Sequence, residues 1–114
     1  MSEFVFKHNM LEIVTRARKF GAKKVLIGTN HPTQKTSKCE GLNISFQESN
    51  EKYNEIIREV AQETKAMLVD HENIWKSKSV DLNKYLLPDH IHVSEKGHQL
   101  YFESVVDSLI KNKV

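Results

Sequence analysis

An aspartate and a histidine near the C-terminus have the residue types and the spacing of an acid–base pair. Asp89 and His92 lie in the segment LPDHIHVSEKGH at residues 87–98. A carboxylate at this spacing can accept the Nδ1 proton of the imidazole and fix its tautomer. Nε2 is then free to take a proton from a hydroxyl or a water. The spacing therefore predicts that His92 is a general base and that Asp89 orients it.

The sequence offers no evident nucleophile for this pair. A serine nucleophile needs a tight, Gly-flanked turn between a strand and a helix, where its hydroxyl is exposed. Five serines are candidates by residue type, and none lies in such a turn: Ser37, Ser45, Ser49, Ser94 and Ser104. Ser94 is close to His92 in sequence, but a helix cap explains it better. A solvent-exposed loop thiol is the preferred interpretation of Cys39. The sequence thus predicts the acid–base half of a hydrolase site.

The composition fits one small folded domain covering residues 1–114. Of these residues 39% are apolar and 28% are charged, which argues against disorder. The net charge of +2 comes from interspersed acidic and basic residues, so nucleic acid is not an expected partner. The apolar runs are too short to span a membrane, and residues 1–20 lack a signal-peptide pattern. The single cysteine, Cys39, excludes an intramolecular disulfide and favours a reducing, cytoplasmic compartment.

Apolar periodicity predicts two helices and a strand in the first half of the chain. Residues 4–20 form an amphipathic helical pattern, and residues 23–28 are a short apolar run typical of a buried strand. Residues 29–47 are predicted to be a long loop, and Asn50 is predicted to cap the next helix. The apolar stripe of the first helix comprises Met10, Ile13, Val14, Ala17 and Phe20. The stripe of the second is the most regular in the chain and comprises Tyr53, Ile56, Ile57, Val60 and Ala61.

The second half is predicted to hold a strand, a mixed segment and a final helix. Residues 66–69 have the pattern of a strand that ends at Asp70, and the pair Asp70-His71 is interpreted as a strand-end cap. Residues 71–88 are mixed, with a helical turn expected near residues 80–86. Ser94 is a favourable N-cap for the last helix. The apolar side of that helix includes Tyr101, Phe102, Val105 and Leu109.

The predicted order of helix, strand, helix, strand, loop and helix places the chain in the α/β class. Two strands joined by a crossover helix are expected to be parallel. A parallel sheet normally has more than two strands and is buried on both faces. The chain is therefore expected to form part of a larger sheet, or to complete one by association. The edge of the strand at residues 24–28 is the expected contact, with either a missing N-terminal half or a second copy in a homodimer.

The segment at residues 89–98 resembles the last motif block of the SGNH hydrolases, also called GDSL-like hydrolases. That block carries an Asp-x-x-His pair followed by a Gly-His helix start. The upstream order is similar to the family as well. It has a helix, a strand ending near a proline (residues 25–32), a Tyr-Asn pair at the head of the next helix (residues 53–54) and a strand that ends in Asp70. The resemblance covers nearly the whole chain and concerns the C-terminal half of the family's domain.

This resemblance implies a flavodoxin-like, three-layer α/β/α fold, of which the chain would hold the last two strands and three helices. It implies a serine ester hydrolase that acts on a small acyl ester or an acetylated carbohydrate and uses no metal or other cofactor. Asp89 would orient the imidazole, and His92 would be the general base and then the general acid. The family's Gly-Asp-Ser nucleophile and its oxyanion donors have no safe counterpart here, so the isolated chain is expected to be inactive.

The sequence GTNH at residues 28–31 is one alternative candidate for the oxyanion-donor block of the family. It superficially resembles the family's Gly-x-Asn-Asp block, in which Asn30 would donate to an oxyanion. His31 stands where that block has an aspartate, so a strand-to-loop turn is the preferred interpretation. Ligands bind beyond the carboxyl ends of parallel strands, and Asn30 and His31 are therefore candidate substrate-binding residues.

Three histidines close to each other raise the alternative of a metal site. His90 and His92 would point to opposite sides of an extended segment, and His98 lies beyond them on a helix, so no metal site is expected.

Two other functions remain open. The chain is either a non-catalytic remnant that binds or oligomerises through its sheet edge, or an autonomous interaction module in which Asp89 and His92 do not hydrogen-bond.

Overall fold

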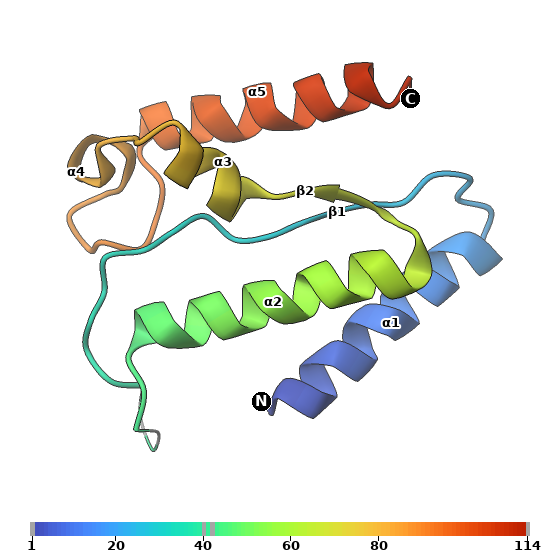
Figure 1. The fold of residues 1–114 in the computed structure, drawn as a ribbon, viewed down its shortest axis with the longest axis horizontal. Helices are drawn as coiled ribbons and strands as arrows, with labels where there is room; N and C mark the ends of the chain where they lie inside the picture. The colour runs from blue at the N-terminus through green and yellow to red at the C-terminus, as the bar shows by residue number, and fades with distance from the viewer. Residues whose placement is uncertain (1, 40, 42, 114) are drawn as a thin grey trace.

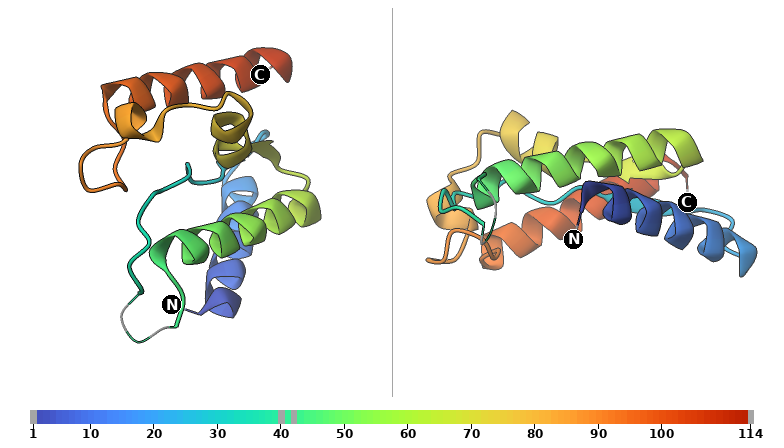
Figure 2. Two further views of the ribbon diagram at one scale, coloured as in Figure 1. Left: turned by 60° about the vertical axis from the view of Figure 1, so that its left-hand side comes forward. Right: turned by 90° about the horizontal axis from the view of Figure 1, so that it is seen from below.

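The computed structural model describes residues 2–39, 41 and 43–113, in which two parallel strands lie between layers of helices. The elements are α1 (Glu3–Lys19), β1 (Leu26–Gly28), α2 (Phe46–Thr64), β2 (Met67–Val69), α3 (His71–Ser77), α4 (Leu82–Tyr85) and α5 (Glu95–Lys111). In Figure 1, α5 lies on one side of the strands and α2 on the other, with α1 packed against α2. Figure 2 shows these layers from two further directions. The predicted α/β class is confirmed; α4 corresponds to the helical turn expected near residues 80–86, and α3 was not expected.

The two strands pair in parallel, with Gly28 of β1 opposite Val69 of β2. Both predicted strands are present, and each is shorter than its predicted range. The prediction that the first strand is buried is wrong, because Leu26 and Ile27 are only half-buried. Among the described residues β1 has a strand neighbour on one edge only, so its side chains lack the cover that a central strand receives.

The cap of α2 is Ser45, and the prediction that Asn50 caps this helix is wrong. The Ser45 hydroxyl accepts from the backbone N–H of Glu48 at 3.0 Å and donates to the Glu48 carboxylate at 3.3 Å. A serine followed three residues later by a glutamate is the signature of a capping box, so the signal was present in the sequence. Asn50 lies one turn inside the helix and donates instead to the backbone oxygen of His31.

Removing this cap should destabilise the chain measurably. We expect Ser45→Ala to lower the free energy of unfolding by about 1 kcal/mol, because an N–H of the first turn loses its acceptor. Ser49→Ala, one turn further along α2, is a matched control and should not destabilise, since alanine is the better helix former. Urea denaturation followed by circular dichroism measures both variants. Equal losses in the two variants would contradict the capping role.

One core cluster lies between α1, α2 and β1. Its buried members are Val14, Ile56 and Val60, and its half-buried members are Phe6, Met10, Leu11, Val25, Ile27 and Tyr53. The predicted stripe of α2 is confirmed as the buried side of that helix. The predicted stripe of α1 is confirmed only in part, because Ile13 is 60% exposed and Phe20 is 86% exposed. α1 packs mainly on α2, so part of its apolar side stays uncovered.

A second core cluster joins α3, α4 and α5. Its buried members are Trp75, Leu86 and Leu100. The sequence patterns did not predict α3, because its seven residues are too few for a periodic stripe. Asp70 caps α3 by accepting from the backbone N–H of Asn73 at 3.2 Å, which confirms its interpretation as a strand-end cap. This cluster supports the loop between α4 and α5.

The chain is more open than a compact domain of its length. Its radius of gyration is 15.1 Å, whereas about 13 Å is typical of a compact domain of similar size. Large apolar side chains are exposed on both helical layers, including Phe4 on α1, Phe20 at its C-cap, and Phe102 and Ile110 on α5. Substantial apolar surface is therefore uncovered. None of the described helices is both long enough and apolar enough to cross a membrane.

Candidate active site

His92 and Asp89 lie in the loop that joins α4 to α5, and their side chains meet there. Nδ1 of His92 is 2.5 Å from Oδ2 of Asp89. The His92 side chain is 73% exposed, and among the described residues no hydrogen-bond partner is found for its Nε2. The predicted contact is therefore present, and an interaction module in which the two side chains do not bond is a poor description of this chain. The catalytic roles that the spacing suggests stay a prediction.

The backbone of this loop is shaped by the same aspartate. Oδ1 of Asp89 accepts from the backbone N–H of Ile91 at 2.9 Å and from that of His92 at 3.0 Å, which is an Asx turn. His90, at the tip of the turn, adopts a left-handed conformation with φ of 64°. One carboxylate therefore holds both the backbone and the ring of His92.

Asp89 stays ionised at every pH near neutrality. The hydrogen bond with His92, followed by the backbone N–H groups of Ile91 and His92, holds the pKa of this carboxyl well below its ordinary value of 3.8. Such a carboxylate keeps the Nδ1 proton in place and stabilises the imidazolium that forms when Nε2 takes up a proton. The ionised Asp89 is therefore able to orient the His92 ring, and the general-base role of His92 stays a prediction.

The candidate serines do not supply a nucleophile turn. Ser45 and Ser94 cap α2 and α5, and Ser104 donates to a backbone oxygen one turn earlier in α5. β1 is followed by Thr29 and β2 by Asp70, so neither strand of the described chain leads into a serine. Within the described part of the chain, no serine therefore lies in a nucleophile turn that could serve Asp89 and His92.

His31 lies beside the loop, and both of its ring nitrogens are occupied. Nδ1 is 2.6 Å from the Tyr101 hydroxyl, and Nε2 is 2.6 Å from the backbone oxygen of Ile91. The ring stacks on that of Trp75, with the two centroids 5.2 Å apart. Burial lowers the pKa of His31 below its ordinary value of 6.5, which favours a neutral ring. The structure thus brings His31 close to the pair in a way that leaves no ring nitrogen free for substrate.

Asn30 is held through its backbone at the carboxyl end of β1. The Asn54 side chain accepts from the Asn30 backbone N–H at 2.7 Å and donates to the Asn30 backbone oxygen at 2.9 Å. Asn54 is fully buried, whereas Asn30 is exposed. This arrangement presents the Asn30 side chain at the strand end, and its substrate-binding role stays a prediction.

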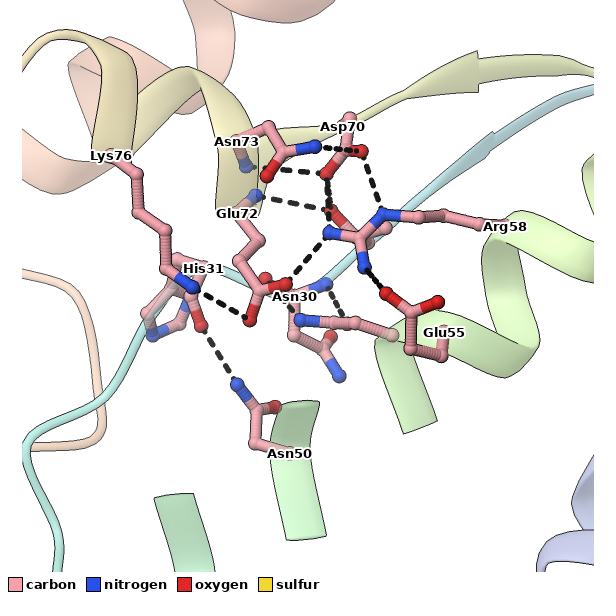
Figure 3. A network of polar contacts seen from close by, with 11 residues as sticks. Asn30, His31, Asn50, Glu55, Arg58, Asp70, Glu72, Asn73 and Lys76 are labelled. Carbon is pink, nitrogen blue, oxygen red and sulfur yellow. Dashed lines mark hydrogen bonds and ion pairs between the residues drawn. The ribbon is translucent and has the colours of Figure 1, made fainter. Parts of the chain in front are cut away.

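A network of charged side chains ties the carboxyl ends of both strands to α2 (Figure 3). Arg58 donates to Asp70 at 2.8 and 3.0 Å and to Glu72 at 2.7 Å. Thr29 donates to Asp70 at 3.0 Å and accepts from the Glu72 backbone N–H at 3.1 Å. Burial alone would raise the pKa of Asp70, but hydrogen bonds from Arg58, the Asn73 backbone and Thr29 lower it overall. Sequence reasoning missed this network because its members are on separate elements.

His71 is a second histidine buried near the strand ends. Its ring centroid is 4.0 Å from that of Tyr101, and its buried Nδ1 has no hydrogen-bond partner among the described residues. Burial, with a smaller effect of the nearby His31, lowers the pKa of His71 from its ordinary value of 6.5 to about 4. The folded chain therefore keeps His71 neutral at pH values where the unfolded chain protonates it.

Acidification should consequently destabilise the chain through His71. Between its unfolded and folded pKa values only the unfolded state binds the proton, so the free energy of unfolding falls as pH falls. The full lowering of the His71 pKa corresponds to a loss of up to about 3 kcal/mol in the free energy of unfolding. We expect His71→Leu to remove this part of the pH dependence and His98→Leu, at an exposed position, to retain it. Urea denaturation at neutral pH and near pH ~4 compares them, and an unchanged pH dependence in His71→Leu would contradict the assignment.

The remaining polar residues that the sequence analysis considered are His90, His98 and Cys39. His90 and His98 are exposed. In the part of the chain that the structure describes, no three His, Cys, Asp or Glu side chains are grouped so as to hold a metal ion. Cys39 is a free thiol that is half-buried and not fully exposed as predicted, because its backbone pairs with that of Ile44 at 3.0 Å.

Comparisons with known proteins identify both a sequence family and a fold. The profile of the GDSL-like Lipase/Acylhydrolase family matches residues 2–100. No curated protein matches the chain. The crystal structure of LAE5, an alpha/beta hydrolase enzyme from the metagenome of Lake Arreo, Spain, is similar over 95% of this chain and 47% of its own, at 17% identity and a TM-score of 0.74. The lipase/acylhydrolase from Enterococcus faecalis is similar over 96% of this chain and 52% of its own, at 18% identity and a TM-score of 0.69. The chain thus spans about half the length of these solved structures.

Proposed function

The chain belongs to the GDSL-like lipase/acylhydrolase family, and on this premise we propose that it carries the acid–base pair of a serine ester hydrolase. His92 is the proposed general base and acid, and Asp89 is the carboxylate that orients it. The observation that carries the proposal is the 2.5 Å contact between Nδ1 of His92 and Oδ2 of Asp89. The chain corresponds to part of such an acylhydrolase, since it spans about half of the solved structures that it matches.

The proposed reaction begins with proton transfer to His92. While Asp89 accepts the Nδ1 proton, Nε2 of His92 takes the proton of a serine hydroxyl as the serine oxygen attacks the ester carbonyl. The carboxylate stabilises the imidazolium, which then gives its proton to the leaving alcohol. Water attacks the acyl-enzyme with the same two proton transfers, and the carboxylic acid is released. Both half-reactions use the exposed Nε2 side of one ring.

The proposed substrate is a small acyl ester or an acetylated carbohydrate. A pocket of about 190 Å³ is lined by residues that include Pro32, Trp75 and Leu82. Trp75 stacks on His31, which bonds to the loop that carries His92. Neither Asp89 nor His92 lines this pocket, so the proposed substrate class rests on the family and not on the size of the pocket.

We place the missing serine and oxyanion donors on a segment that pairs with the free edge of β1. Among the described residues β2 is the strand neighbour of β1, and the opposite edge is unpaired. α1, which shares a core cluster with β1, exposes Ile13, and its C-cap residue Phe20 is exposed as well. Further strands at this edge, with their own helices, would extend the sheet and cover apolar surface of this kind. The Gly-Asp-Ser half of the family is the proposed occupant.

A second candidate function is non-catalytic binding or oligomerisation through the same edge, with a second copy of the chain as the occupant. The observation that favours it is the same unpaired edge of β1, since open edges readily pair with other chains. Sedimentation of the purified chain separates the candidates. A concentration-dependent dimer that Leu26→Pro abolishes would favour the homodimer, because the backbone of Ile27 pairs with β2 and that of Leu26 faces the open edge.

The deciding experiment starts from the reading frame upstream of codon 1. An in-frame segment that encodes Gly-Asp-Ser and then Gly-x-Asn would supply the proposed half, and the joined protein should hydrolyse p-nitrophenyl acetate. A joined protein that folds and shows no esterase activity would contradict the proposal. The absence of any such segment would shift attention to the binding alternative.

A further inference from the structure

A set of contacts links the end of β1 to the residue that precedes His92. Nε2 of His31 is 2.6 Å from the backbone oxygen of Ile91, and Nδ1 of His31 is 2.6 Å from the hydroxyl of Tyr101 on α5. The same hydroxyl accepts from the backbone N–H of His31 at 2.9 Å. The His31 imidazole therefore joins the end of β1 to the loop at Ile91 and to α5, which lie 60 and 70 residues further along the chain.

The donors and acceptors of this cluster fix which ring nitrogen of His31 carries the proton. The backbone oxygen of Ile91 can only accept, so Nε2 must donate to it. The Tyr101 oxygen already accepts from a backbone N–H, and burial raises the pKa of this phenol, so the hydroxyl proton is available to Nδ1. Burial also lowers the pKa of His31, which favours a ring with a single proton. The neutral Nε2–H form satisfies all of these groups.

Both the ring and the backbone of His31 are held by further contacts. It stacks on Trp75, which is 1% exposed and belongs to the core of α3, α4 and α5. Asn50 of α2 donates to the backbone oxygen of His31 at 3.1 Å, as Figure 3 shows. A side chain restrained in this way loses little further freedom when it bonds to Ile91. The contact with the loop is therefore preorganised.

The loop that carries His92 has few other ties to the segment after β1. The side-chain hydrogen bonds of Asp89 stay within the loop. One further tie is the backbone N–H of Gln34, which donates to the backbone oxygen of His90 at 3.0 Å. A general base works only if its nitrogen is held within about 2.6–3.2 Å of the group whose proton it takes. The placement of the loop against the strand end is thus part of the site.

We propose that His31 is a positioning residue for His92, acting through the backbone oxygen of Ile91 and not by touching substrate. The inference rests on the proposed acid–base role of His92. The contacts from Tyr101 through His31 to Ile91 set the loop against the carboxyl end of β1, the side on which parallel-sheet enzymes bind ligands. Without the Ile91 contact, the loop should sample conformations in which the Asp89–His92 bond is broken.

Two variants separate the two ring contacts of His31. A glutamine amide reaches the place of Nε2, whereas an asparagine amide, one methylene shorter, reaches only the place of Nδ1. His31→Asn should therefore lose the Ile91 contact, and His31→Gln should retain it. NMR of the chain reports the loop through hydrogen exchange of the Ile91 and His92 amides, which both donate to Asp89. The nitrogen-15 shifts of the His92 ring report whether Nδ1 carries the proton.

In His31→Asn the two amides should exchange about tenfold faster, the size expected for one lost hydrogen bond. The His92 ring should also lose its preference for the Nδ1 proton, and His31→Gln should restore both properties. Equal behaviour of the two variants, including no change in either, would overturn the positioning role.

A measurement on the unmodified chain tests the same idea without depending on whether a variant folds. The His31 ring should carry its proton on Nε2, and a proton on Nδ1 would overturn the positioning role. If the acid–base role proposed for His92 is wrong, the same measurement gives a different result. The unmodified chain would then show a His92 ring without the Nδ1 proton, whatever the state of His31.

Discussion

Replacing His92 by alanine should nearly abolish ester hydrolysis in a protein that joins this chain to the proposed Gly-Asp-Ser half. We expect kcat/KM to fall by about 10⁴-fold with little change in KM, because the serine loses the base that takes its proton. Asp89→Asn should cost on the order of 10³-fold to 10⁴-fold, since an amide N–H can donate to Nδ1 and stabilise the wrong tautomer. Initial rates of p-nitrophenyl acetate hydrolysis measure both.

The matched control for these variants is His98→Ala. His98 is exposed on α5, six residues beyond His92, and takes no part in the proposed chemistry. Its loss should change the rate by less than about twofold, provided that circular dichroism shows the same fold. A His92→Ala protein that retains more than about a tenth of the activity would contradict the general-base role.

The contact between Asp89 and His92 could be predicted from the sequence because its geometry is local. Asp89 and His92 are three residues apart, and a single Asx turn brings their side chains together. The apolar stripe of α2 and the Ser94 cap of α5 are local patterns too, and the structure confirms both. Features of this kind follow from the chain's own spacing and need no knowledge of distant segments.

The surroundings of the pair could not be predicted, because they depend on contacts between distant segments. His31 meets Ile91 across 60 residues and Tyr101 across 70 residues, and no periodic pattern marks such pairs. The position of His31 after a parallel strand suggested substrate binding, which stays a prediction, but it gave no sign of the bonds that the ring forms to Ile91 and Tyr101. The burial of β1 and α1 was overestimated for a related reason. A stripe shows which side of an element is apolar, but it does not show whether anything covers that side, as Phe20 illustrates.

Arg58→Leu should lower the free energy of unfolding by about 3 kcal/mol. The substitution leaves Asp70 without Arg58, and it leaves Glu72, which is only 4% exposed, with the longer ion pair to Lys76 at 3.9 Å. Removing one partner of a buried ion pair costs about 3–5 kcal/mol, because the other charge stays buried and uncompensated. The lower end applies here, since the side chains of Arg58 and Asp70 are still 21% and 20% exposed. Urea denaturation of the two proteins gives the difference.

Arg16→Leu is the matched control for this substitution. Arg16 forms an equally short pair with Glu12, at 2.7 Å, but the two side chains are 69% and 49% exposed. An exposed pair of this kind contributes less than about 0.5 kcal/mol, because water solvates both charges once the pair is broken. Equal losses in Arg16→Leu and Arg58→Leu would show that burial does not decide the strength of the Arg58 network.

Arg58→Leu should lower the free energy of unfolding, and the pH dependence of this deficit separates the contribution of charge from that of packing. In the unmodified chain burial would raise the pKa of Asp70, and its hydrogen bonds, with that from Arg58 foremost, lower it below the ordinary value of 3.8. The stability gained in this way is present above that value and is lost as pH falls through the folded pKa. Without Arg58 the Asp70 carboxylate takes up its proton at higher pH, so the deficit should shrink from neutral pH towards about pH 4. The effect of His71 is common to both proteins and cancels in the difference. A deficit that stays constant with pH would instead assign the loss to the packing of the Arg58 methylene groups, and the ends of β1 and β2 would then owe their placement to shape and not to charge.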